Sequence, residues 1–90
     1  MAFKDKVYSL VKKIPRGKTK SYSEIAKLAG RPKAWRLVGS ILNKNKNPNV
    51  PCHRIIRSDG FLAGYNKGLR KKERLLKKEG VKIEKGRVVH

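Results

Sequence analysis

The chain has 90 residues, of which 25 are Lys or Arg and 6 are Asp or Glu, and its formal net charge is +19. Ninety residues make one domain, expected over 1–90, whose core buries about 60–65% of the surface that the unfolded chain exposes. One cysteine excludes an intrachain disulfide framework and a cysteine-based zinc site, and the charged start and the lack of a long apolar run exclude a signal peptide and a membrane span. We therefore expect an intracellular protein of the cytoplasm or nucleoid, with no metal and no cofactor.

So large an excess of positive charge destabilises the compact state by self-repulsion unless a polyanion offsets it. Nucleic acid is the expected partner, because phosphate neutralisation releases counterions. The alternative is a Lys-rich surface that serves solubility or a hot habitat, but such surfaces pair Lys with Glu, and Glu is scarce here. A membrane surface is a weak competitor, since no segment joins a basic face to a bulky aromatic face.

The first predicted helix covers residues 2–14, where apolar residues recur on one face. Pro15-Arg16-Gly17 ends it and begins a basic turn, Lys18-Thr19-Lys20. Ser21 or Ser23 can cap a second helix, and Gly30 stands where a glycine follows a helix end.

A third helix is predicted from Pro32 to Asn43, with Pro32 in its first turn. Two helices joined by a short glycine-containing turn, with a basic and polar outer face on the second, indicate a helix-turn-helix, although an ordinary pair of core helices gives the same spacing. The expected outer face consists of Lys33, Trp35, Arg36, Gly39, Ser40 and Asn43.

The remaining segments are shorter. Residues 43–49 read as a loop, 54–57 as a short strand and 58–60 as a turn. Residues 61–68 read as a glycine-rich loop, and a basic helix follows over 69–79, anchored by Leu69, Leu75 and Leu76 and closed by Gly80. The tail alternates well enough for a small hairpin, or it is a frayed end.

The stretch from Val50 to Ile56 holds the only cysteine, and a histidine follows it directly. A neighbouring imidazolium and many Lys and Arg residues favour the thiolate, which is the nucleophilic form of Cys52. Pro51 places the thiol on a defined backbone. The alternative is that Cys52 is a small buried apolar residue, because successive side chains of an extended segment point to opposite sides.

Pro51-Cys52-His53-Arg54-Ile55 resembles the active-site motif of the O6-alkylguanine-DNA alkyltransferases. The resemblance runs from about Val7 to Gly80 and includes Gly17-Lys18-Thr19-Lys20-Ser21-Tyr22, Trp35-Arg36-Leu37-Val38-Gly39 and Gly64-Tyr65-Asn66-Lys67-Gly68-Leu69. It implies a mainly α, winged helix-turn-helix-like single domain with a short β element near the active site. It also implies a monomer that binds double-stranded DNA containing O6-alkylguanine.

The resemblance assigns roles to individual residues. Cys52 would attack the O6-alkyl carbon, His53 would act as its base through a water, and Glu79 would orient the imidazole. Tyr22 would crowd the phosphate of the target nucleotide and donate a hydrogen bond to the departing guanine. Arg36 would enter the base stack as the guanine flips out.

The resemblance also implies a substrate pocket and further DNA contacts. Tyr65, Asn66 and Lys67 would wall the pocket, and backbone carbonyls of Cys52 and Ile55 would select guanine. Asn45 would tie the helix-turn-helix to the active-site segment. The expected DNA-binding residues are Arg36, Ser21, Trp35, Lys33, Ser40 and Asn45.

The resemblance therefore implies a DNA-repair methyltransferase that transfers the alkyl group irreversibly to its own Cys52, once per molecule. An alkyltransferase-like damage sensor is the alternative within the resemblance, although such proteins lack the cysteine that is present here. A general chromatin or RNA-binding protein leaves the Cys-His pair unexplained. A cysteine hydrolase lacks an acyl-binding signature.

Overall fold

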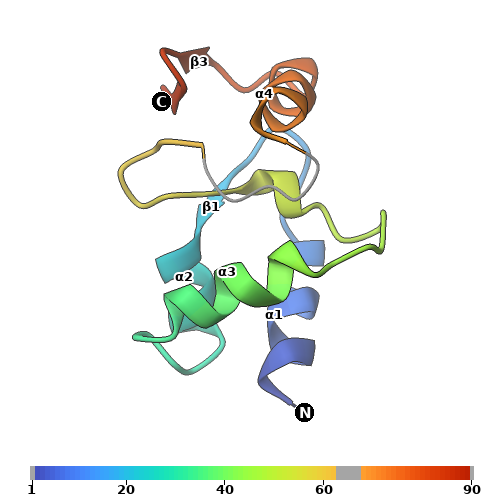
Figure 1. The fold of residues 1–90 in the computed structure, drawn as a ribbon, viewed down its shortest axis with the longest axis vertical. Helices are drawn as coiled ribbons and strands as arrows, with labels where there is room; N and C mark the ends of the chain where they lie inside the picture. Colours follow the sequence, from blue (N-terminus) through green and yellow to red (C-terminus); the bar gives the residue numbers. More distant parts are fainter. Residues whose placement is uncertain (1, 63–67, 90) are drawn as a thin grey trace.

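The computed structural model describes residues 2–62 and 68–89, which form a body of 35 × 25 × 20 Å (Figure 1). It confirms a mainly helical fold with a helix-turn-helix and short β elements. In these residues, no helix is long and apolar enough to cross a membrane. The helices are α1 (Phe3–Lys12), α2 (Tyr22–Leu28), α3 (Trp35–Asn43), the 3-10 helix η1 (Cys52–Arg54) and α4 (Leu69–Lys78), and the strands are β1 (Lys20–Ser21), β2 (Ile55–Ile56), β3 (Ile83–Glu84) and β4 (Arg87–Val88).

Helix α2 begins as its sequence predicts. Ser21 is the N-cap, its hydroxyl accepts a hydrogen bond from the Glu24 N–H at 3.0 Å, and the Glu24 carboxylate accepts from the Ser21 N–H at 3.2 Å. This reciprocal capping box satisfies two N–H groups that the first turn leaves without a helical partner. The chain leaves the helix through Gly30, whose φ of +88° suits a residue without a Cβ.

Helix α3 begins later than predicted, at Trp35 rather than Pro32. The Ala34 N–H donates to the Arg31 carbonyl at 2.9 Å and closes a turn over 31–34. The residues of this turn are therefore not helical, so Pro32 does not occupy a first helical turn. Lys33, expected on the outer face of the helix, precedes it.

Two apolar clusters meet at the short strand β2. Ile55, fully buried, belongs to the cluster that α1, α2 and α3 form, whereas its neighbour Ile56 packs with Leu76 of α4 and with the C-terminal hairpin. Adjacent residues of a strand face opposite sides, so two residues can join two cores. Strand β2 pairs in parallel with β1, with Lys20 opposite Ile55, which fixes the start of α2 against the segment that follows Cys52.

In the C-terminal half, one predicted core residue of α4 is exposed, and the structure decides between a hairpin and a frayed end for the tail. Leu69, predicted to anchor α4, is 50% exposed, while Leu76 is fully buried. The tail forms the hairpin rather than a frayed end: β3 and β4 pair antiparallel, with Ile83 opposite Val88. Gly80 closes α4 as predicted, with a φ of +92°.

Replacing Gly39 with Ala should stabilise the protein by about 0.5–1 kcal/mol, because Gly costs this much relative to Ala inside a helix. A Cβ at position 39 would lie 3.7 Å from the Tyr22 ring, an ordinary van der Waals contact. Urea denaturation of the two proteins measures the difference. A loss of stability would contradict this expectation and would show that the Tyr22 ring needs an open α3 surface.

Candidate active site and DNA-binding face

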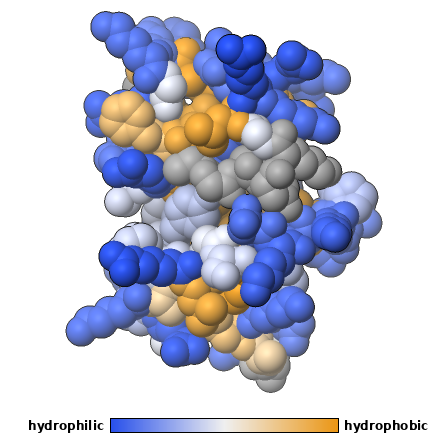
Figure 2. All heavy atoms as spheres, viewed as in Figure 1, coloured by the Kyte–Doolittle hydropathy of each residue, from blue (hydrophilic) through white to orange (hydrophobic). Residues whose placement is uncertain are grey.

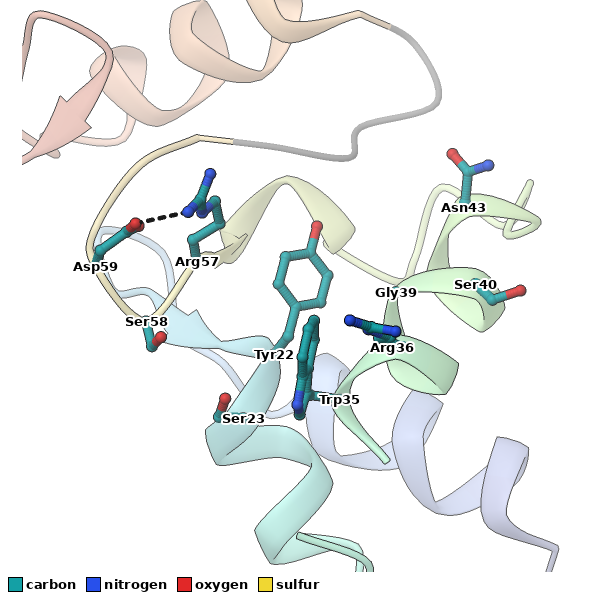
Figure 3. A pocket seen from close by; sticks show the side chains of 10 residues that line it. All are labelled: Tyr22, Ser23, Trp35, Arg36, Gly39, Ser40, Asn43, Arg57, Ser58 and Asp59. Carbon is teal, nitrogen blue, oxygen red and sulfur yellow. Dashed lines mark ion pairs between the residues drawn. The ribbon is translucent and has the colours of Figure 1, made fainter. Parts of the chain in front are cut away.

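A cavity of about 810 Å³ opens between the helix-turn-helix and the turn that follows β2 (Figure 3). The Tyr22, Trp35 and Arg36 side chains converge on it from the starts of α2 and α3, and Arg57 and Asp59 form the opposite rim. Its mixture of aromatic, guanidinium and hydroxyl groups suits a nucleotide, which presents both a flat ring and charged phosphate. The lining residues are Tyr22, Ser23, Trp35, Arg36, Gly39, Ser40, Asn43, Arg57, Ser58 and Asp59.

Arg36 and Trp35 pack together on this face. The guanidinium carbon of Arg36 lies 5.0 Å from the centre of the Trp35 ring, and Trp35 is 45% exposed. A cation over an indole face is attractive by about 0.5–1 kcal/mol at an exposed site. Both side chains are therefore accessible to a duplex, and the contact between them orients Arg36 at the mouth of the cavity.

Ser40, also predicted to bind DNA, lines this cavity, whereas Ser21, Lys33, Asn45 and Ile55 are not among its lining residues. The Ser21 hydroxyl is engaged as a helix cap, Lys33 is exposed in the turn before α3, and the Ile55 side chain is buried in the core. Asn45 is 7% exposed. Tyr65, Asn66 and Lys67 lie outside the described residues.

Cys52 begins η1, so the predicted strand over 54–57 is shorter than expected and starts only at Ile55. The Asn45 amide donates to Cys52 Sγ at 2.9 Å and to the Val50 carbonyl at 3.4 Å. These bonds place the thiol, which is partly exposed, at the junction between the end of α3 and η1.

Glu79, just after α4, joins two residues of the Cys-His-Arg run. His53 Nε2 lies 3.0 Å from Glu79 Oε2, and Arg54 forms a two-pronged contact with the same carboxylate at 2.9 and 2.7 Å. Arg54 also donates to the Ile14 carbonyl at 2.8 Å. The Glu79 side chain is 8% exposed, and its pKa is lowered to about 2, chiefly by the hydrogen bonds from Arg54 and next by those from His53, against the opposing effect of burial. Glu79 is therefore ionised at neutral pH and fixes the His53 ring.

Residues 2–81 match the family model described as "6-O-methylguanine DNA methyltransferase, DNA binding domain". The chain belongs to this methyltransferase family. It is 52% identical over 81 residues to the methylated-DNA–protein-cysteine methyltransferase of Methanosarcina acetivorans, covering 87% of this chain and 51% of that protein. It is 41% identical over 85 residues to the bifunctional transcriptional activator/DNA repair enzyme Ada of Escherichia coli, covering 93% of this chain and 24% of that protein.

Solved structures agree with the family assignment. Mycobacterium tuberculosis OGT in complex with DNA superimposes with a TM-score of 0.83 at 41% identity, covering 89% of this chain and 49% of that chain. Schizosaccharomyces pombe Atl1, in complex with damaged DNA containing O6-carboxymethylguanine, gives a TM-score of 0.83 at 36% identity, covering 91% of this chain and 79% of that chain. The present chain spans about half the length of the Methanosarcina methyltransferase.

One buried side chain of this family member was not predicted as a site residue. Lys72 of α4 is fully buried, and its Nζ lies 5.8 Å from the centre of the Tyr22 ring. Burial lowers the Lys72 pKa to about 8, while the charge of Cys52 opposes that change. Lys72 lies three residues after Leu69 and four before Leu76, on the apolar stripe of α4. This helical spacing is the feature of the sequence from which the burial of Lys72 could have been predicted.

Tyr22 connects the cavity with Cys52. Its ring lines the cavity, and burial together with the nearby charge of Cys52 raises the pKa of its hydroxyl. Tyr22 therefore stays protonated at neutral pH and can donate a hydrogen bond. In the part of the chain that the structure describes, no three His, Cys, Asp or Glu side chains gather to hold a metal ion.

Proposed function

We propose that this protein binds duplex DNA containing O6-alkylguanine and transfers the alkyl group irreversibly to Cys52. The observation that carries the proposal is the contact between Glu79 and His53, the residue that follows Cys52: the buried Glu79 carboxylate lies 3.0 Å from the imidazole Nε2. A cavity lined by Tyr22 and Arg36 supports the DNA-binding half of the proposal. The names of its relatives support the reaction class.

The proposed transfer is an in-line displacement at the alkyl carbon. The Cys52 proton passes to His53, and the thiolate attacks the alkyl carbon in line with the carbon–O6 bond. The carbon–sulfur bond forms as the carbon–oxygen bond breaks, and the electron pair stays on the guanine. Tyr22 donates a hydrogen bond to the guanine as this charge develops. The guanine takes up at N1 the proton that left Cys52, returned from His53 through solvent, so a thioether, a neutral imidazole and an unmodified guanine remain.

Arg36 and residues 65–67 would act before the alkyl transfer. Arg36 occupies the space that the flipped nucleotide leaves, which offsets the few kcal/mol that unstacking costs. The family resemblance implies that Tyr65, Asn66 and Lys67 would wall the base pocket and that the backbone carbonyls of Cys52 and Ile55 would accept from the exocyclic amine of guanine.

The test is the intact mass of the protein after incubation with a duplex that carries one O6-methylguanine. The expected result is the gain of one methyl group in place of a proton, which saturates at one per molecule. Cys52→Ala should show no gain while it still binds the duplex. A wild-type mass that does not change would overturn the transfer.

A damage-sensing protein without transfer is the second candidate. One observation favours it: the fold superimposes with a TM-score of 0.83 on Atl1, a structure in complex with damaged DNA containing O6-carboxymethylguanine. The same experiment separates the candidates. An unchanged mass with tighter binding to the lesion duplex than to an undamaged one would indicate a sensor, and an unchanged mass without such preference would leave a general DNA-binding domain.

A further inference from the structure

The C-terminal hairpin lies beyond residues 2–81, the part of the chain that the family model matches. It nevertheless packs against the rim of the DNA-binding cavity. The Val88 N–H donates to the Gly60 carbonyl at 2.9 Å, and Arg87 Nε donates to the Asp59 carbonyl at 2.9 Å. Figure 1 shows the hairpin beside the chain segment that follows β2. The hairpin and the turn at 58–60 therefore form one unit.

A second hollow, of about 260 Å³, continues the cavity surface toward this hairpin. It shares Arg57, Ser58 and Asp59 with the first cavity and extends from them to Lys20 and Arg87. The exposed surface thus runs without interruption from the helix-turn-helix over the turn at 58–60 to β4. Figure 2 shows hydrophilic side chains along most of the outline of the molecule.

Two of the three basic side chains that line this second hollow form ion pairs with a carboxylate. Lys20 pairs with Glu24 at 3.7 Å and Arg57 pairs with Asp59 at 2.8 Å. Arg87 packs over the Phe61 ring at 5.7 Å, and among residues 2–62 and 68–89 no carboxylate forms an ion pair with it. Its Nε donates to the Asp59 carbonyl. The two terminal nitrogens of the guanidinium can therefore donate two hydrogen bonds to one anion such as phosphate.

The hairpin tip adds a second positive charge. Lys85 has a φ of +53°, and Gly86 follows it with a φ of +77°, so the connection between β3 and β4 is a tight turn. The Lys85 and Arg87 side chains are both exposed. A hairpin with basic residues at its tip and on its strand, packed on the turn at 58–60 that also rims the cavity, suits the phosphate backbone of a duplex better than it suits a base edge.

We propose that the C-terminal hairpin is a wing that binds the phosphate backbone of the duplex flanking the damaged nucleotide, with Arg87 as its principal contact. This inference rests on the proposed binding of duplex DNA. It adds a contact outside the groove of α2 and α3, on one flank only, because the hairpin lies to one side of the cavity.

The test pairs a protein change with a DNA change. Fluorescence anisotropy gives the affinity for a long duplex with one central O6-methylguanine and for two duplexes shortened on either flank. The wild type should lose affinity when one particular flank is shortened.

Arg87→Gln should bind the long duplex more weakly, and its affinity should no longer depend on that flank. Arg87→Lys should regain most of the affinity. Between 50 and 200 mM salt, Arg87→Gln should lose about threefold less affinity than the wild type, as expected for one phosphate contact fewer.

Two further variants make the result specific. Lys12→Gln removes one exposed charge from α1 and should weaken all duplexes equally. Lys85→Asn, whose new residue tolerates a positive φ, removes the tip charge without touching Asp59 or Phe61 and should reproduce the flank-dependent loss even if Arg87→Gln unfolds.

The outcomes are distinct. If the wild type binds the lesion duplex but Arg87→Gln and Lys85→Asn behave like Lys12→Gln, the wing is overturned and the proposed function stands. If the wild type does not bind the lesion duplex at all, the proposed function fails, and the wing fails with it.

Discussion

Glu79→Gln should lower the free energy of unfolding at pH 7 by about 3 kcal/mol, because it leaves the Arg54 guanidinium buried without a carboxylate. The Glu79 and Arg54 side chains are 8% and 16% exposed, so solvent can replace little of the lost contact. Gln keeps the size of the side chain and removes only its charge. Urea denaturation at pH 7 measures the change.

The pH dependence provides a second measurement of the same contact. The pKa of Glu79 is lowered from 4.5 to about 2, so its stabilisation is complete above pH 4.5 and is lost as the pH falls toward 2. That difference corresponds to about 3 kcal/mol. The wild type should therefore lose stability over this interval relative to Glu79→Gln.

The matched control is Glu73→Gln on α4. Glu73 pairs with Lys77 at 3.2 Å, and their side chains are 36% and 56% exposed. Such surface pairs contribute about 0.3–0.5 kcal/mol, so this variant should be nearly neutral. If Glu73→Gln and Glu79→Gln lose equal stability, the buried contact with Arg54 is not the cause.

Lys72→Met should raise the free energy of unfolding at pH 7 by up to about 3 kcal/mol, because it removes a fully buried ammonium and fills the same volume with an apolar chain. The pKa of Lys72 falls from 10.5 to about 8 on folding, chiefly because burial disfavours the charged form. A gain of this size is the expected result. A loss of more than 1 kcal/mol would show that the contacts of the ammonium outweigh the cost of its burial.

The direction of the pH effect distinguishes this explanation from a simple change in packing. Below pH 8 Lys72 is charged in both states, and the cost of burying it is complete. As the pH rises from 8 toward 10.5, the folded protein binds fewer protons than the unfolded chain, so stability increases. The raised pKa of Tyr22 opposes this trend above pH 10, so pH 8 to 10 is the interval to measure. Lys72→Met should lack this rise.

Local rules account for the parts of the fold that were predicted correctly. The capping box of Ser21 and Glu24 lies within four consecutive residues, and the positive φ of Gly30 and Gly80 follows from helix ends that sequence patterns mark directly. The Cys-His-Glu order needed the family resemblance, because Glu79 lies 26 residues after His53. Without that resemblance, Glu79 is one more carboxylate beside Lys77 and Lys78.

The errors have three different causes. The start of α3 was misplaced because Pro32 favours a first helical turn, whereas the observed bond from Ala34 to the Arg31 carbonyl makes a separate turn. Lys72 was missed because lysine is almost never fully buried, although it occupies the apolar stripe of its helix. Arg57 and Asp59 read only as turn residues, since nothing local shows that the turn meets the helix-turn-helix across a cavity.

Arg54 has a consequence for how the motif itself should be understood. Its guanidinium joins the chain just after α1, through the Ile14 carbonyl, to the end of α4, through Glu79, while its backbone belongs to η1. Three segments distant in sequence thus share one side chain. A chain that exchanged Cys52 for another small residue would still need this arginine to assemble its tertiary structure. The arginine of the Pro-Cys-His-Arg signature therefore identifies an architecture, whereas the proposed reaction depends on Cys52 and His53.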